Sequence, residues 1–516
     1  MSSTSDPTPY DEIPYPSYTH KHSHPEVLAT QAILHGLNPA PVGACRVLEL
    51  GCGNGSNLIP MASSLPGSRF TGADLSACAV EHGNGAVRDL GLANIELRHA
   101  NILDINESWG EFDYIIAHGV FSWVPPEVRD KILTICQELL APQGVAFISY
   151  LALPGAHVRA MLRDMMLYHA GDTPDAAGLL AAGKEVASFI ASAAPAGDAV
   201  QRALQGEAAR FLDAMPNYVL HDDLAEWSAP YYFIQFAGMA ADHGLQFLAE
   251  ADSTEMVDLH LPPPVRENLA RIAPGRLYRE QYLDFIKARR FRQTLLCRAE
   301  ATVSESAWRD RVPELWVASS TKGPEGAIDL SPEVEVGFVS PRGPKLDTAL
   351  PSGKAALSML IDAWPLRLPF SDLVKGVHSQ LAAAGLPEAA EGSLAESLAG
   401  FLHHLNSVGL VEFYSEPSRQ CKAISARPLA SAMARWQAAR GNLITTLRHV
   451  GLTFQDEMTI RLIPLLDGTR TLEELIAAML SSTNAPGSDP AAEHAEMEAI
   501  VAERLERLAT EGILMG

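Results

Sequence analysis

Three alternating glycines near the start of the chain could hold a nucleotide-like ligand. Residues 46–50 form a short apolar run that is typical of a buried parallel strand, and the glycines follow it directly. Glycine allows positive φ and lets a ligand approach the main chain without meeting a Cβ. A strand, a glycine turn and a helix together make the nucleotide-binding corner of a doubly wound sheet. The candidate residues of this turn are Glu49, Gly51, Cys52, Gly53, Asn54 and Gly55.

An acid follows the turn at the spacing that a ribose site requires. Residues 69–73 predict the second strand, and Asp74 comes directly after it, 74 − 55 = 19 residues beyond the last glycine. A carboxylate that binds a ribose hydroxyl pair is expected roughly 20 residues after such a turn. Asp74 and the adjacent Leu75 are therefore candidate cofactor-binding residues.

These motifs stand within a repeating order of strands and helices. The strands are expected at 46–50, 69–73, 95–98, 112–117 and 144–150, in the order of a parallel sheet. Ligands of such folds bind at the carboxyl ends of the strands. His118 and Gly119 follow the fourth strand there, and Asn101 and Ile102 follow the third.

The segment Leu48-Glu-Leu-Gly-Cys-Gly-Asn-Gly55 resembles the first motif of class I S-adenosylmethionine (SAM) methyltransferases. The resemblance implies a Rossmann-like domain with a mixed, mostly parallel seven-stranded sheet, and SAM as the cofactor. It places the glycine turn under the methionine moiety, Asp74 on both ribose hydroxyls, and Asn101 and Ile102 beside the adenine. An aspartate is common at position 101 in that family, so Asn101 departs from the pattern.

Two further blocks resemble one methyltransferase subgroup. The arm Tyr10-Asp-Glu-Ile-Pro-Tyr-Pro-Ser-Tyr18 is similar to its N-terminal segment, and blocks between 218 and 296 are similar to its "methyltransferase regulatory domain". The subgroup includes the rickettsial outer-membrane-protein lysine methyltransferases. The resemblance spans roughly residues 10 to 300 and names the subgroup better than the substrate.

Aromatic side chains around the expected methyl-transfer site suggest an amine acceptor. A lysine is charged at pH 7, and a partly dry pocket favours its neutral form. Aromatic faces also attract the cationic product. His118 is a candidate proton acceptor, with a structural role as its alternative. The cage candidates are Tyr15, Tyr18, Phe121, Trp123, Tyr231 and Tyr232.

The last third of the chain contains an internal repeat. Residues 355–413 and 459–514 each predict helix, turn and helix, then a helix that ends in Gly-[Leu/Ile]-[Val/Leu]. The pattern resembles a winged helix. The candidate recognition helix, 393–407, has no Lys or Arg, so DNA binding is not expected. Capture of a peptide and plain packing or homodimerisation remain equal alternatives.

Composition limits the classes of partner. The formal net charge of −23 repels phosphate backbones, so we expect a protein or peptide substrate and no nucleic acid. Without a signal peptide or an apolar run of about 18 residues, we expect a cytoplasmic protein with no stable membrane association. The six cysteines show no metal-ligand spacing, and no acid or cysteine cluster supports the alternating His20, His22 and His24, so no metal is expected.

The predicted organisation is an arm (1–24), a SAM-binding methyltransferase domain (25–156), a helical regulatory middle domain (157–301), a linker (302–330) and a C-terminal winged-helix-like repeat domain (331–516). The favoured function is SAM-dependent N-methylation of a protein or peptide amine, with lysine preferred. One alternative is a small natural-product or ribosomal-peptide acceptor with the C-terminal region as a docking module. The other is a non-catalytic SAM-binding interaction protein.

Overall fold

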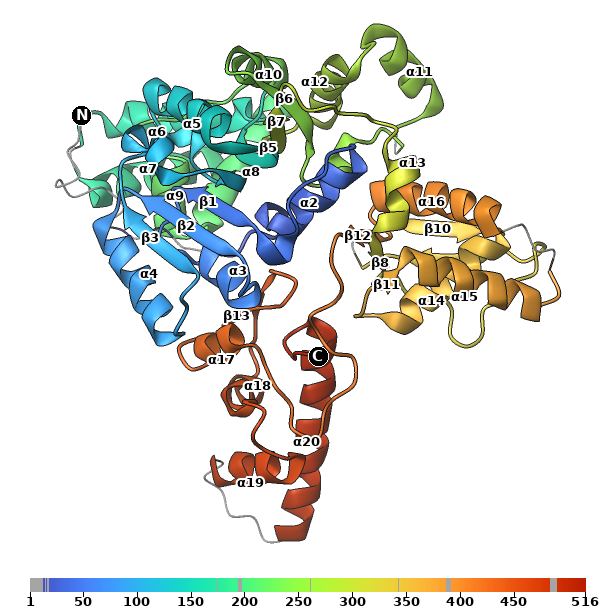
Figure 1. Ribbon diagram of the computed structural model, residues 1–516. Helices are drawn as coiled ribbons and strands as arrows, with labels where there is room; N and C mark the ends of the chain where they lie inside the picture. Colours follow the sequence, from blue (N-terminus) through green and yellow to red (C-terminus); the bar gives the residue numbers. More distant parts are fainter. Residues whose placement is uncertain are drawn as a thin grey trace.

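One mixed sheet organises the first 300 residues (Figure 1). The computed structural model describes residues 13, 15, 18–173, 175–193, 197–259, 261–341, 343–386, 391–482 and 490–516. Within them, a seven-stranded sheet has the order β3-β2-β1-β4-β5-β7-β6. The strands are β1 (Arg46–Leu50), β2 (Arg69–Asp74), β3 (Ile95–His99), β4 (Phe112–Ala117), β5 (Leu140–Leu151), β6 (Leu245–Glu250) and β7 (Phe291–Arg298).

The pairing confirms the predicted fold class. Strands β1 to β5 pair in parallel, and β7 runs antiparallel to both β5 and β6. The sheet crosses the domain boundary predicted at residue 156, because β6 and β7 come from the segment predicted as the middle domain. The sheet is therefore completed only after an inserted group of helices.

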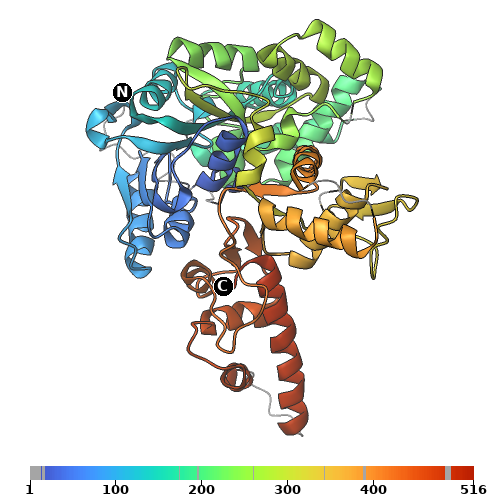
Figure 2. The same ribbon diagram turned by 45° about the vertical axis from the view of Figure 1, so that its right-hand side comes forward.

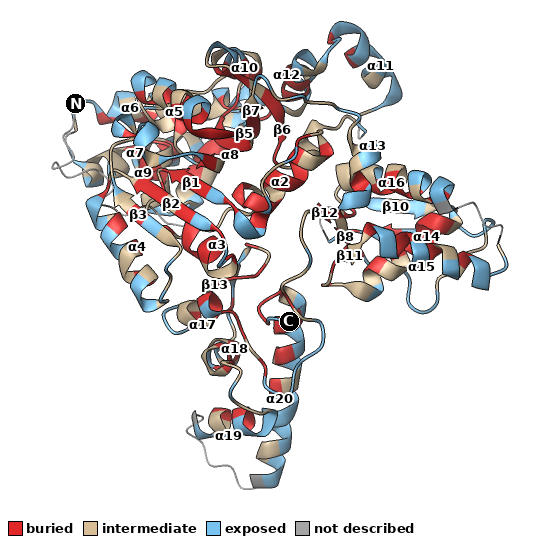
Figure 3. Ribbon diagram, viewed as in Figure 1, coloured by how far each residue is buried: buried red, intermediate tan, exposed pale blue. Residues whose placement is uncertain are grey.

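Helices cover both faces of this sheet, and the strands are largely buried between them (Figure 3). Successive side chains of a strand point to opposite faces, so Val47 packs with α2, α3 and α4, and Leu48 packs with α5 and α10. The covering helices are α2 (Pro25–Leu34), α3 (Leu58–Ser64), α4 (Ala77–Asp89), α5 (Pro126–Leu139) and α10 (Phe233–Asp242).

The inserted helices form their own small core beside the sheet. Phe211 of α8 is fully buried and packs with residues of α6, α7 and α9. These helices are α6 (His157–Ala170), α7 (Ala176–Ala191), α8 (Ala199–Asp213) and α9 (Pro216–Asp222). The helices α11 (Pro263–Ile272) and α12 (Arg276–Lys287) stand between β6 and β7 in the chain.

A buried charge cluster fastens α12 to the last two strands. Arg292 of β7 is 1% exposed and binds Glu250 at 2.5 Å, Glu280 at 3.0 Å and Asp284 at 2.9 Å. Its guanidinium also lies 4.1 Å from the centre of the Phe233 ring. A buried charge is stable only when it is paired and hydrogen-bonded, and this arginine satisfies that condition.

The segment predicted as a linker, 302–330, is partly structured. It contains α13 (Trp308–Arg311) and β8 (Trp316–Ala318), and β8 is the middle strand of the small sheet β11-β8-β12. Val317 is fully buried there. A three-residue strand leaves too little periodicity to be recognised in the sequence, so the prediction of a linker did not include it.

Two units of similar design follow. We call residues 351–414 the first winged-helix unit; it contains α14 (Pro351–Ala363), β11 (Leu368–Pro369), α15 (Phe370–Ala383), α16 (Glu391–Ser407) and β12 (Glu412–Tyr414). The hairpin of β9 (Val336–Val339) and β10 (Lys345–Thr348) precedes it. We call residues 426–513 the second winged-helix unit; it contains α17 (Ala432–Ala438), β13 (Leu443–Thr445), β14 (Gly451–Thr453), α18 (Glu457–Leu462), α19 (Leu472–Ser482) and α20 (Pro490–Glu511).

The predicted order of three helices and a closing strand is seen as α14, α15, α16 and β12 in the first unit. It is seen again as α18, α19 and α20, followed by an isolated bridge at Leu514, at the end of the second. An isolated bridge at Asp467 takes the place of β11, and the one at Leu514, the residue directly after the unit, takes the place of β12. The long α20 projects away from the rest of the molecule (Figure 2). No helix among the described residues is both long and apolar enough to cross a membrane.

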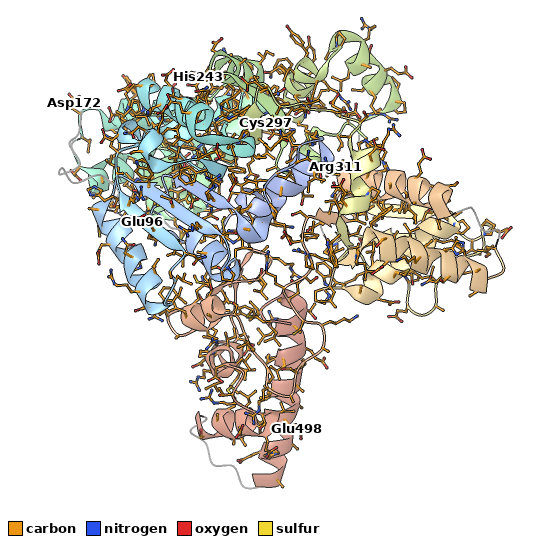
Figure 4. All side chains as sticks on the ribbon, viewed as in Figure 1. Glu96, Asp172, His243, Cys297, Arg311 and Glu498 are labelled. Carbon is orange, nitrogen blue, oxygen red and sulfur yellow. The ribbon has the colours of Figure 1, made fainter. Side chains whose placement is uncertain are left out.

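Helix α2 joins the sheet to the first winged-helix unit. Glu26 of α2 is buried and binds Arg367 through both carboxylate oxygens, one of them at 3.0 Å. Arg311, labelled in Figure 4, donates a 3.1 Å hydrogen bond to the carbonyl of Leu37 just after the same helix. Helix α2, which covers the sheet, and the segment that follows it are therefore in direct polar contact with the C-terminal half.

Candidate active site

The glycine turn has the backbone conformation that its sequence requires. Gly51, Gly53 and Gly55 have φ values of 70°, 53° and 74°, which favour glycine over other residues. A Cβ at Gly51 would overlap the side chain of Val120. The amides of Gly51 and Cys52 donate to the carbonyl of Ala73 at 2.8 and 3.1 Å, so the turn is fixed to β2.

Asp74 lies against this turn. Its Oδ2 accepts a 2.7 Å hydrogen bond from the Gly53 amide, and its Oδ1 accepts one of 2.9 Å from the Ser76 amide. Ser76 caps α4 by accepting from the Ala79 amide. The structure therefore brings the predicted ribose acid and the glycine turn together at the carboxyl ends of β1 and β2.

Glu49 is a buried acid with one free oxygen. Its side chain is 4% exposed, and Oε1 accepts a 2.7 Å hydrogen bond from Asn57 Nδ2. Oε2 has no hydrogen-bond partner among the described residues. Burial raises the pKa of Glu49 to about 8, the Asn57 hydrogen bond opposes this, and the negative charge of Asp74 adds to it. An unsatisfied buried oxygen is costly, so a ligand that donates a hydrogen bond or carries a positive charge would be stabilised here.

The predicted adenine-side residues lie at the ends of β2 and β3. Asn101 caps the short 3₁₀ helix η3 (Ile102–Asp104), with its Oδ1 accepting from the Leu103 amide at 3.0 Å. Leu75 offers its carbonyl to His99 Nε2 at 3.1 Å. The Asn101 side-chain oxygen is thus engaged in holding its own loop, a task that asparagine and aspartate perform equally well.

His118 lies at the end of β4 under the N-terminal segment. The centres of the His118 and His20 rings are 3.7 Å apart, and His118 Nδ1 is buried with no hydrogen-bond partner among the described residues. Burial, followed by the nearby His20 and His22, holds the pKa of His118 well below its usual range. Its ring is therefore neutral at physiological pH. The adjacent Gly119 amide donates to Ser149 Oγ at 2.8 Å, which fixes the start of the following loop to β5.

The three alternating histidines near the arm have three separate roles. His20 packs against His118 with its ring tilted, His22 Nδ1 contacts Gln293 Oε1 at 2.8 Å, and His24 accepts from the Glu26 amide as the cap of α2. The backbone N–H of His20 donates to Asn57 Oδ1 at 2.9 Å. The segment 18–24 therefore crosses from the start of α3 to the end of β4, over the cofactor side of the sheet.

Not all of the predicted cage residues line one pocket. Phe121 is fully buried and packs between Tyr231 and Phe236, with ring centres 5.8 and 5.3 Å away, so its place in the cage stays a prediction. Phe121 and Trp123 belong to the 3₁₀ helix η5 (Phe121–Trp123), in which each residue points in a different direction, and Phe121 points into the core. Tyr231 accepts from Arg129 at 2.9 Å, and Tyr232 packs against Phe285.

Trp123 and Tyr15 both contact Asp222, a residue that was not among the site residues predicted from the sequence. Trp123 Nε1 donates to the carbonyl of Asp222 at 3.2 Å, and Tyr15 Oη donates to the Asp222 carboxylate at 3.2 and 3.3 Å. The Tyr218 ring lies 5.6 Å from that of Tyr15. Burial raises the pKa of Asp222 to about 6, Arg159 opposes the rise, and Asp223 adds to it. Tyr18 is 37% exposed, and Tyr10 lies outside the described residues.

Comparisons with known proteins agree with this geometry. Three family models match: "Methyltransferase domain" over residues 47–144, "Predicted methyltransferase regulatory domain" over 215–298, and "PKMT, C-terminal winged helix domain" over 426–513. The uncharacterised protein RP789 of Rickettsia prowazekii is 33% identical over 485 residues, which cover 92% of this chain and 86% of RP789. The chain belongs to this methyltransferase family.

Solved structures extend the comparison over the full chain. PKMT2 from Rickettsia typhi is 28% identical, with a TM-score of 0.86 over 97% of this chain and all of that one. PKMT2 in complex with AdoHcy matches with a TM-score of 0.84 over 98% of this chain and all of that one. The protein is a SAM-dependent methyltransferase of class I, and SAM is its cofactor. The glycine turn and the free oxygen of Glu49 fit that cofactor, whose methionine part carries an ammonium group and a sulfonium.

Proposed function

We propose that this methyltransferase transfers methyl groups to lysine side chains of a protein or peptide. The observation that carries the proposal is the position of Asp222 between Tyr15, Tyr218 and Trp123. A carboxylate with aromatic neighbours suits the head group of a lysine, because the acid accepts hydrogen bonds from the ammonium and ring faces attract its charge.

The comparisons support the same acceptor class. The second winged-helix unit matches a model named for PKMT, and PKMT stands for protein lysine methyltransferase. The similarity to PKMT2 covers the regulatory and C-terminal regions as well as the SAM-binding domain. A net charge of −23 would also attract a lysine-rich substrate.

The residues near the site have separate roles in cofactor binding, acceptor binding and proton transfer. We assign Asp74, Glu49 and the glycine turn to SAM, which when bound supplies a methyl group whose carbon–sulfur bond breaks as the amine lone pair forms the new carbon–nitrogen bond. Asp222 and Tyr15 hold the lysine head group, and Trp123 limits the access of water. The amine must first lose a proton, and His118, whose buried Nδ1 has no partner among the described residues, is the candidate acceptor. The burial that keeps its ring neutral also opposes its protonation. Alignment of the two reactants supplies most of the acceleration in such a displacement.

A labelling experiment separates the lysine assignment from its rivals. The enzyme is incubated with methyl-labelled SAM and a bacterial protein extract, either untreated or with its lysines acetylated. We expect label in protein from the untreated extract and its loss after acetylation, with the Asp74→Ala variant as the inactive control. Label confined to small molecules would favour a natural-product acceptor, and label that survives acetylation would refute lysine as the target. SAM binding without any transfer would indicate a non-catalytic binding protein.

A further inference from the structure

The tip of a C-terminal hairpin reaches the cofactor site. His449 lies in the turn between β13 and β14, in the second winged-helix unit, and is 4% exposed. Its Nε2 is 2.8 Å from Oδ1 of Asn57, the residue that precedes α3. In Figure 1 the hairpin lies beneath α3, and the contact joins residues 392 positions apart. Thus the C-terminal part of the chain contacts the start of α3, next to the glycine turn of the SAM-binding domain.

The Asn57 amide uses all four of its hydrogen-bonding positions. Its Oδ1 accepts from the His20 backbone at 2.9 Å and faces His449, and its Nδ2 donates to Ser23 Oγ at 3.0 Å and Glu49 Oε1 at 2.7 Å. A backbone N–H can only donate, so the contact with His20 fixes which side of the amide is oxygen. His449 must therefore donate from Nε2. Burial holds the pKa of His449 well below its usual range, so this ring is neutral.

The backbone of His449 has an uncommon conformation that its surroundings must maintain. His449 has φ 58°, and only one other non-glycine residue among those described, Ala288, has a positive φ. This conformation is uncommon for a histidine and costs free energy, so surrounding contacts must maintain it. The His449 amide donates to the Thr446 carbonyl at 2.9 Å, and the His24 ring lies 5.1 Å from the His449 ring.

We propose that His449 is a positioning residue of the cofactor site: it orients Asn57, and Asn57 holds Glu49 with its free oxygen presented to SAM. The second winged-helix unit is then part of the SAM site rather than an independent attachment. Any partner that displaces this unit will weaken SAM binding. The inference concerns cofactor binding, so it stands whether or not lysine is the acceptor.

The chain offers a matched set of variants for the test. His449→Asn tolerates positive φ, but its side chain is too short to reach Asn57. His449→Gln restores a donor at about the reach of the imidazole Nε2. Arg448→Ala is the control, because Arg448 holds the same hairpin through the carbonyls of Thr510 and Glu511 and does not contact Asn57.

Calorimetric titration with SAM and thermal melting without SAM give the two readouts on the full chain. We expect His449→Asn to raise the Kd for SAM about tenfold, and His449→Gln to remain within about threefold of the parent. Arg448→Ala should lower the melting temperature at least as much as His449→Asn and leave the Kd unchanged. An unchanged Kd in His449→Asn would overturn the proposal. So would a loss of affinity in Arg448→Ala or His449→Gln equal to that in His449→Asn, because the effect would then reflect hairpin stability alone.

Discussion

The carboxylate of Asp74 accepts a 2.7 Å hydrogen bond from the Gly53 backbone, which joins the ribose acid to the glycine turn. Gly53 adopts φ 53° to direct its amide there. The other oxygen of Asp74 accepts from Ser76 at the start of α4. Asp74 therefore shapes two turns of the cofactor site in addition to any contact with the ribose.

We predict that Asp74→Ala raises the Kd for SAM by about 100-fold, because hydrogen bonds to a charged group contribute roughly 1.5–3 kcal/mol each. Asp74→Asn keeps an oxygen for the Gly53 amide but loses the charge, so its Kd should lie between those of the parent and Asp74→Ala. Calorimetric titration measures both. An unchanged Kd in a folded Asp74→Ala protein would remove Asp74 from the site.

Asp222 should make acceptor binding depend on pH. Its pKa is raised to about 6, so the carboxylate is charged above that pH and becomes neutral as the pH falls through it. We expect the KM for a lysine substrate to rise as the pH falls below about 6, because a neutral acid binds an ammonium less strongly. Asp222→Asn should raise KM about tenfold at pH 7.5 and abolish this limb of the profile.

The exposed neighbour Glu226 provides the control for that measurement. Glu226→Gln removes a negative charge from the loop that follows α9 and should leave KM and its pH dependence unchanged. If Asp222→Asn keeps the parental KM and pH profile, the head group of the substrate does not bind at Asp222.

The charge cluster around Arg292 should contribute to stability rather than to chemistry. Arg292→Met leaves the buried Glu250 without its cation, and leaves Glu280 and Asp284 with Arg289 alone. Breaking a buried pair costs about 3–5 kcal/mol. We expect denaturant unfolding to show a loss of that size. Arg290→Met is the matched control in the same region, because Arg290 is 46% exposed and pairs with Glu207; its loss should be about 1 kcal/mol or less. Equal losses in the two variants would contradict the role given to the cluster.

Deletion of residues 1–18 should reduce turnover far more than stability. The deletion removes Tyr15 from Asp222 but leaves His20 on Asn57, and the first strand begins only at Arg46. We expect initial rates to fall by at least about tenfold with a small change in melting temperature, because closure of the site excludes water and aligns the amine. Tyr15→Phe removes only the hydroxyl and should have a smaller effect. A collapse of the melting temperature would make the arm a structural strap, and full activity would exclude it from the site.

Local sequence patterns were sufficient for the first five strands of the sheet and for the cofactor turn. The apolar run at 46–50, the three glycines and Asp74 specify their conformation through nearby residues, so their places could be predicted. The last two strands were harder, because β6 and β7 pair with β5 only after the inserted helices α6 to α9. The hydrophobic pattern of the sequence does not reveal that the chain comes back to the sheet after these helices.

The remaining site residues depend on contacts between distant parts of the chain. Phe121 and Trp123 stand two positions apart, yet one is buried in the core and the other contacts Asp222, because a 3₁₀ turn separates their directions. Asp222 stood within the regulatory-domain block, and only the fold places it beside Tyr15. The contact between Asn57 and His449 had no signal in the sequence.

Identification of the amino acid that receives the methyl group tests the assignment of lysine as the acceptor most directly. Protein labelled by the enzyme with methyl-labelled SAM is hydrolysed in acid, and the labelled amino acids are separated by chromatography and identified by mass spectrometry. We predict that the label elutes as Nε-methylated lysine and is absent when Asp74→Ala replaces the parent enzyme. Label on any other amino acid, or label found only outside the protein fraction, would contradict it.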